Sequence, residues 1–177
     1  MKIINLIFGL IVITSINYKS YACTCIGGKR TIKKAFKHND IIFYGKVIYK
    51  EKVLFDFIPT SRGDTIKFYK DKYTFMIKKV FKGKIKCSTI EIVTGKGHGD
   101  CGISFKLGKN YIVYSHWEKL PFNPYLLKQK RKLKEKYLDT NICTRTTMKI
   151  REELDKINKY LAHRSWIYYL FRRKNRE

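Results

Sequence analysis

Five cysteines are the residues in this chain of 177 whose chemistry stands out first: Cys23, Cys25, Cys87, Cys101 and Cys143. Cys23 and Cys25 are separated by one residue, and a ring that small is strained, so each is expected to bond to a distant partner. If those partners are Cys101 and Cys143, two long loops are closed and Cys87 is left as the unpaired thiol. No C-x-x-C pair is present, so the spacing does not favour a structural zinc site.

The segment before Cys23 predicts where this thiol chemistry takes place. It carries one early positive charge, then an apolar run from Ile3 to Ile16, and it ends in Ser20-Tyr21-Ala22. Small residues at the first and third places before a cleavage point are what signal peptidase requires, so we expect 1–22 to be a cleaved signal peptide. The mature chain would then be secreted or periplasmic, in a compartment where disulfides form. Cleavage would make Cys23 the N-terminus, either free or lipidated, although lipid-modified cysteines usually follow an aliphatic residue at the place that Ser20 occupies.

The remaining candidates for catalysis or ligand binding form no recognisable set. The four histidines lie on separate predicted elements without the spacing of metal ligands: His38, His98, His116 and His163. The glycine-rich segment 95–102 lacks Gly-Lys-Ser/Thr and precedes an extended segment, so it is predicted to be a tight turn and not a phosphate site. No serine or cysteine has a matching histidine and carboxylate, and no pair of carboxylates is apparent. We therefore predict that the protein is not an enzyme and needs no cofactor.

Net charge is the other outstanding property of the sequence. Lysine and arginine number 39 and aspartate and glutamate 14, giving a formal charge of +25. This balance points to polyanions such as nucleic acid, anionic lipid or acidic polysaccharide. The alternative interpretation is a lysine-rich solvated surface, because arginine supplies only nine of the 39 cations. The distinctive clusters are Lys128–Lys136, in a predicted loop, and a tail in which arginines flank Trp166–Phe171. Aromatic residues bordered by cations suit a membrane interface, whereas a helix end packed on the domain is the alternative.

The elements that must position these residues are predicted to be mainly β. Alternating apolar and polar residues predict five strands, at Asp40–Phe57, Thr65–Val80, Cys87–Thr94, Lys109–Trp117 and Tyr137–Thr144. Apolar residues at helical spacing from Ile150 to Leu161 predict a helix after the last strand. Five strands and a helix are the outline of a five-stranded OB-fold barrel with a C-terminal α-helix packed against it. The expected organisation is a signal peptide over 1–22, an OB-fold domain over 23–163 and a basic aromatic tail over 164–177.

Four short segments stand in an order and spacing that are typical of a known family. They are Cys23-Thr24-Cys25, Asn39–Val47, Cys101-Gly102 and Thr140–Thr146. Together they resemble the tissue inhibitor of metalloproteinases family, within the netrin-like OB-fold group, and the resemblance covers Cys23 to Leu161. It implies the disulfides Cys23–Cys101 and Cys25–Cys143, with Cys87 unpaired.

The resemblance also implies a function, the inhibition of a zinc metalloprotease. In this family the α-amino group and carbonyl oxygen of the N-terminal cysteine, here Cys23, chelate the catalytic zinc of the protease and displace its water. An amine of pKa ~8 loses its proton readily to a metal. Thr24 would enter the specificity pocket, Cys25 would complete the wedge, and Gly99, Asp100 and Cys101 would form a second contact segment. The zinc belongs to the target protease.

The chain also departs from the animal members of this family. It is expected to be a minimal, single-domain member, because the sequence shows fewer cysteines and no second disulfide-rich domain. Gly99 and Asp100 stand where the animal inhibitors present small or apolar residues, so the Asp100 carboxylate is expected to face the catalytic carboxylate of the enzyme. The alternative function is a polyanion- or membrane-surface-binding OB-fold module without protease inhibition. That module would use the lysine-rich loop and the tail for peripheral membrane association, and in either case we expect a monomer.

Overall fold

The computed structural model describes residues 25, 30–96, 100–120 and 135–174, with side chains described as far as Trp166. The predicted signal peptide, Cys23, Thr24 and Gly99 therefore lie outside the described residues, as does most of the lysine-rich loop.

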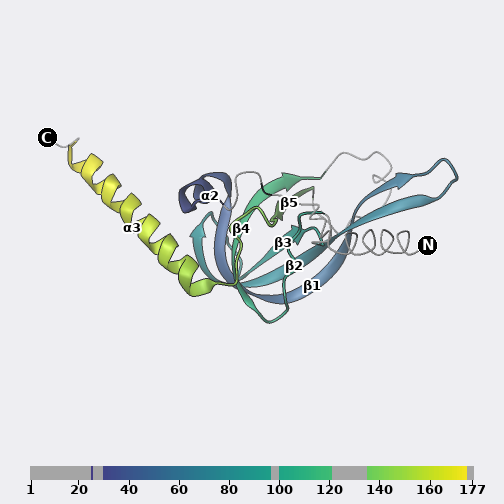
Figure 1. Cartoon of the computed structure of the whole chain (residues 1–177), viewed down its shortest axis with the longest axis horizontal. Coiled ribbons are helices and arrows are strands. Elements are labelled where there is room, and N and C mark those ends of the chain that lie inside the picture. The colour runs from purple at the N-terminus through teal and green to yellow at the C-terminus, as the bar shows by residue number, and fades with distance from the viewer. Residues whose placement is uncertain (1–24, 26–29, 97–99, 121–134, 175–177) are drawn as a thin grey trace, which may run out of the picture.

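Five strands close into one barrel (Figure 1). They are β1 (Ile41–Pro59), β2 (Thr65–Lys82), β3 (Thr89–Thr94), β4 (Asn110–Lys119) and β5 (Lys136–Asp139). Their order around the barrel is β1-β2-β3-β5-β4, and β1 also pairs with β4 to close it. All pairs are antiparallel except β3 and β5, which are parallel and joined at Val93 and Asp139. The mainly β fold expected from the sequence, an OB-fold barrel followed by a helix, is confirmed.

The barrel interior is filled by aromatic and β-branched side chains that alternate along the strands. Phe75 and Tyr111 both pack edge to face on Phe105, with ring centroids 5.1 and 4.8 Å away. Phe43 and Tyr73 complete the cluster, and both are fully buried. Burying large rings in edge-to-face contact is a strong source of stability in a small domain.

A second core lies outside the barrel, under the helices α2 (Ile32–His38) and α3 (Ile150–Lys174). Ala35 and Phe36 of α2 meet Ile157 of α3 over the outer face of β1 and β4. Helix α2 was not predicted from the sequence. It begins at Thr31, whose hydroxyl accepts the amide hydrogen of Lys34 at 3.3 Å in an ordinary N-cap.

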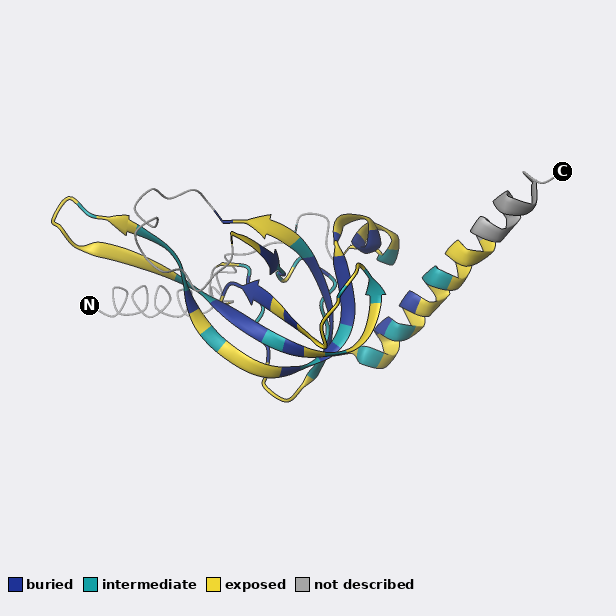
Figure 2. Cartoon of the chain, turned by 180° about the vertical axis from the view of Figure 1, so that it is seen from behind, coloured by how far each residue is buried: buried dark blue, intermediate teal, exposed yellow. Residues whose placement is uncertain are grey.

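Two elements, β5 and α3, differ from the expected boundaries by more than two residues, and one hairpin extends beyond the barrel. The β1–β2 hairpin extends past the barrel as a two-stranded ribbon (Figure 2). Strand β5 ends at Asp139 instead of Thr144, and α3 continues through Lys174 instead of ending near Leu161. The predicted tail is therefore helical as far as Lys174 and forms one element with the helix that packs on the barrel.

Candidate functional site

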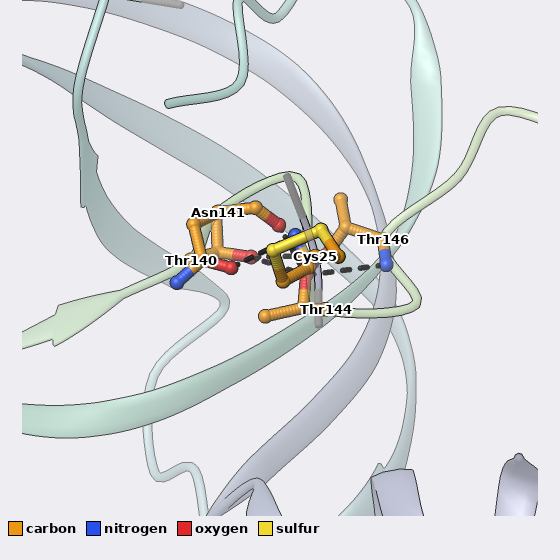
Figure 3. Close-up of a disulfide and its surroundings, with 6 residues drawn as sticks. Cys25, Thr140, Asn141, Thr144 and Thr146 are labelled. Atoms are coloured by element: carbon orange, nitrogen blue, oxygen red, sulfur yellow. Dashed lines mark hydrogen bonds between the residues drawn. A yellow bond between two sulfur atoms is a disulfide. The ribbon is translucent and has the colours of Figure 1, made fainter. Parts of the chain in front are cut away.

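A disulfide between Cys25 and Cys143 fastens the N-terminal segment to the turn that follows β5 (Figure 3). The two cysteines are 118 residues apart in the sequence, and their Cα atoms lie 5.3 Å apart. This is the Cys25 bridge that the resemblance implies. The bridge fixes Cys25, the last residue of the expected wedge, at this edge of the barrel.

The turn replaces the second half of the predicted fifth strand, and Asn141 explains the difference. Its side-chain oxygen accepts the amide hydrogen of Cys143 at 3.0 Å. Its carbonyl oxygen accepts both the amide hydrogen and the hydroxyl hydrogen of Thr144, at 3.1 and 2.8 Å. Asparagine side chains compete in this way with strand pairing. The turn therefore presents Cys143 toward the N-terminal segment.

The loop that contains Cys101 lies against the same turn. The amide of Ile142 donates to the carbonyl oxygen of Cys101 at 2.9 Å. Cys101 has a φ of 56°, in the left-handed region that non-glycine residues rarely adopt. Cys101 is disulfide-bonded, as the expected Cys23–Cys101 bridge requires, and Cys23 itself lies outside the described residues.

Asp100 closes this loop on itself. Its carboxylate accepts the amide hydrogens of Lys96, at 2.7 Å, and Gly102, at 3.3 Å. A Cβ at Gly95 would lie 2.4 Å from the carboxyl group of Asp100, and one at Gly102 would lie 2.1 Å from the backbone of Gly95. A side chain at Gly102 would therefore meet backbone, whereas one at Gly95 would require the Asp100 side chain to move. Residues 97–99, in the middle of the predicted glycine turn, lie outside the described residues, so the turn stays a prediction. The carboxylate that the resemblance places toward a protease accepts hydrogen bonds from two backbone amides of its own loop.

Three threonines lie around the disulfide and bond to one another (Figure 3). The Thr140 hydroxyl donates to the carbonyl oxygen of Tyr114 at 2.8 Å and lies 3.0 Å from those of Thr144 and Thr146. Thr94 donates to the carbonyl oxygen of Thr140 at 2.7 Å, which ties β3 to the turn. Thr140 and Thr94 are fully buried, so this edge of the barrel has a polar interior whose hydroxyls are hydrogen-bonded.

A buried ion pair ties the turn to α3. Arg145 donates two hydrogen bonds to the carboxylate of Glu153 on α3, at 2.8 and 2.6 Å. The Tyr114 hydroxyl donates to the same carboxylate at 2.7 Å. Burial raises the pKa of Glu153, but the hydrogen bonds from Arg145 and Tyr114 outweigh it and hold the pKa below its ordinary value. Arg145 also donates to the carbonyl oxygen of Arg30 at 2.7 Å, a second point at which the N-terminal segment is held.

Sequence reasoning missed the ion pair and the threonine cluster. The one available signal was the density of threonine between Thr140 and Thr147, where four of eight residues are threonine. Arg145 and Glu153 resemble ordinary surface charges, and only the path of the chain makes them neighbours.

Cys87, predicted to be unpaired, is a free and exposed cysteine. It lines a cleft of about 420 Å³ beside β3 and β5, together with Trp117 and Lys136. The ammonium group of Lys136 lies 5.2 Å from the centre of the Trp117 ring. None of Cys25, Cys101 and Cys143 lines this cleft.

Comparison with models of known protein families and with curated protein sequences gives no match for this chain.

Within the described residues, no cluster of three or more His, Cys, Asp or Glu side chains could hold a metal ion. His38 ends α2, His116 lies 3.1 Å from Glu118 on β4, and His163 lies on α3, while His98 is outside the described residues.

Proposed function

We propose that this protein is a secreted or periplasmic inhibitor of zinc metalloproteases that acts through the α-amino group and carbonyl oxygen of Cys23. The observation that carries the proposal is the attachment of Cys25 to Cys143, next to the loop of Asp100 and Cys101. Three segments far apart in the sequence thus meet at one edge of the barrel, as an inhibitory wedge with a second contact segment requires.

Preorganisation is the physical reason why such an edge suits inhibition. A segment that is already ordered loses little conformational entropy when it enters a protease cleft. Cys25 is held by its disulfide, and the carbonyl oxygen of Arg30 is held by Arg145. The expected Cys23–Cys101 bridge would hold the residues just before Cys25 in the same way. Thr24, the first of these, would then enter the specificity pocket beside the zinc.

The loop electrostatics also support the proposal. An ionised Asp100 facing the catalytic carboxylate of a protease would oppose binding. The two amide hydrogens that Asp100 accepts stabilise its charge within the loop and draw the carboxylate toward Lys96 and Gly102. The departure from the small or apolar residues of the animal inhibitors is therefore compatible with a contact at this loop.

The first experiment is N-terminal sequencing of the exported protein, followed by inhibition assays against a panel of zinc metalloproteases. We expect a free Cys23 and inhibition that does not weaken steeply with salt. One alanine added before Cys23 should weaken inhibition by at least roughly 100-fold, because it removes the central zinc contact. The matched control carries the same alanine after Glu177 and should inhibit normally. An uncleaved or acylated Cys23, or an extended protein that inhibits as well as the parent, would rule out this mechanism.

A further inference from the structure

Helices α2 and α3 and the end of β2 enclose a groove of about 430 Å³ whose lining is strongly cationic. It is lined by Lys33, Phe36, Lys37, Lys82, Tyr160 and Arg164, and none of these side chains is acidic. The ammonium group of Lys82 is already engaged, since it donates to the carbonyl oxygens of Phe36 and Asn39 at the end of α2. Lys33, Lys37 and Arg164 remain as three cations around a hollow floored by two aromatic rings, which suits a phosphate group with an apolar attachment.

The part of α3 that extends past this groove is exposed as far as its side chains are described. Each residue from Ala162 to Trp166 is exposed, and Trp166 is 62% exposed. The helical backbone continues to Lys174 and projects away from the barrel (Figures 1 and 2). A helix that leaves its core is only marginally stable in water, so it gains from another surface.

The composition of this helix identifies the surface that would suit it. Between Asp155 and Glu177 the sequence has no acidic residue and seven lysines and arginines. The same stretch holds an aromatic and aliphatic run, Trp166–Phe171. Cations alone would fit nucleic acid equally well, but aromatic rings bordered by cations favour the boundary between lipid headgroups and acyl chains. In the part of the chain that the structure describes, no helix is long and apolar enough to cross a membrane.

We propose that the α2–α3 groove and the projecting part of α3 form a docking surface for an acidic phospholipid membrane. A headgroup phosphate occupies the groove between Lys33, Lys37 and Arg164, and Trp166 enters the interface beside it. This surface is independent of the proposed protease inhibition. It shares no residue with the barrel edge formed by the Cys25–Cys143 disulfide, the turn after β5 and the loop of Asp100 and Cys101. A molecule that used both would inhibit proteases at the membrane surface.

The experiment measures cosedimentation of the purified protein with phosphatidylcholine vesicles, with and without phosphatidylglycerol. The N-terminus of the protein is sequenced first. We expect binding that requires the acidic lipid and falls steeply with salt. Replacing Lys33, Lys37 and Arg164 by glutamate should weaken binding by roughly 100-fold, since each basic residue near an anionic surface adds to the attraction. The matched control reverses three exposed lysines elsewhere, Lys67, Lys106 and Lys109, and should lose far less. Equal losses in the two triple variants, or equal binding to neutral vesicles, would overturn the proposal.

A second measurement follows Trp166 directly, in a Trp117→Phe background that leaves it the single tryptophan. Its fluorescence should shift to the blue with acidic vesicles and be quenched by lipids brominated near the headgroup. The groove variants should abolish both effects while retaining the circular dichroism spectrum of the parent. A Trp166 spectrum unchanged by acidic vesicles would overturn the proposal. So would tighter, groove-dependent binding to duplex DNA than to acidic vesicles, which would identify the partner as nucleic acid.

Discussion

Two regions invert the usual relation between hydrophobicity and burial. They are the turn segment, residues 140–146, and the outer half of α3, residues 162–174. The turn segment is polar, yet Thr140 and Thr144 are buried near a disulfide. The outer half of α3 contains Trp166, which is exposed. Hydroxyls can be buried where partners satisfy every hydrogen bond, and an aromatic ring stays exposed where the fold offers it no neighbour. The comparison suggests that the first region stabilises the fold and the second contributes little stability in solution.

Removing the disulfide tests the first half of this comparison and should have the largest effect. Cys25→Ser combined with Cys143→Ser frees a loop of 118 residues. In the chain-entropy model this lowers the free energy of unfolding by on the order of 4 kcal/mol. Urea denaturation measures the loss. Cys87→Ser is the control and should change stability by less than about 0.5 kcal/mol, because that thiol is exposed and free. A double variant as stable as the parent would mean that hydrogen bonds alone hold the turn.

The ion pair beneath the turn should have the next largest effect. Arg145→Ala leaves the Glu153 carboxylate, whose side chain is only 6% exposed, without its cation. Removing one partner of a buried pair costs about 3 kcal/mol. Thermal or urea unfolding at neutral pH measures this change. Lys149→Ala is the control, since its ion pair with Glu152 is exposed and should be worth less than about 1 kcal/mol. Equal effects of the two substitutions would contradict the buried geometry.

The same pair predicts how stability depends on pH. The pKa of Glu153 in the folded state lies below its ordinary value of 4.5. A lowered pKa means that this carboxylate stabilises the fold above its unfolded pKa, and that the contribution disappears as the pH falls through the folded pKa. Stability of the parent should therefore fall between neutral pH and strongly acidic pH. Glu153→Gln should remove part of that slope, as measured by urea midpoints across the acidic range. An unchanged slope would show that other carboxylates account for it.

The hydroxyl of Thr140 should have a smaller effect. Thr140→Val keeps the shape of the side chain but leaves the carbonyl oxygen of Tyr114 without this donor. Losing such a buried hydrogen bond costs about 1–2 kcal/mol. Thr140→Ser keeps the hydroxyl and serves as the matched comparison. If valine were tolerated as well as serine, the buried hydroxyls would contribute nothing to stability.

Trp166→Ser completes the comparison with the smallest expected effect. In the absence of lipid the free energy of unfolding should change by less than about 0.5 kcal/mol, because the ring is exposed. Ile157→Ala, on the packed half of the same helix, should cost about 3 kcal/mol because Ile157 is fully buried. A large loss on changing Trp166 would show that the outer half of α3 packs on the fold.

Much of the barrel could be predicted from the sequence, because strand residues alternate between the barrel interior and its outer face. Phe43 and Phe75 follow this alternation and lie in the core. Helix α2 escaped prediction because it has seven residues, of which only Ala35 and Phe36 are buried, too few to show a helical period. The end of strand β5 was predicted five residues too late, since Asn141 forms a turn that apolar periodicity does not register.

The candidate site was less predictable than the barrel. Spacing showed only that Cys25 bonds to a distant cysteine, and the choice of Cys143 came from the resemblance. The ion pair of Arg145 with Glu153 depends on where α3 packs, which residue types do not reveal. Asp100 was expected in the second contact segment. The direction of its carboxylate could not be predicted, because it depends on the close approach of Gly95 and Gly102.

The long span of the Cys25–Cys143 bridge has a consequence for the order of events during synthesis. A chain made from its N-terminus exposes Cys25 long before Cys143, and both Cys87 and Cys101 emerge in between. Wrong pairings therefore have time to form, and thiol–disulfide exchange must reverse them before the native bridge appears. Recovery of the oxidised protein should accordingly depend on a disulfide isomerase, and replacing the free Cys87 by serine should reduce that dependence.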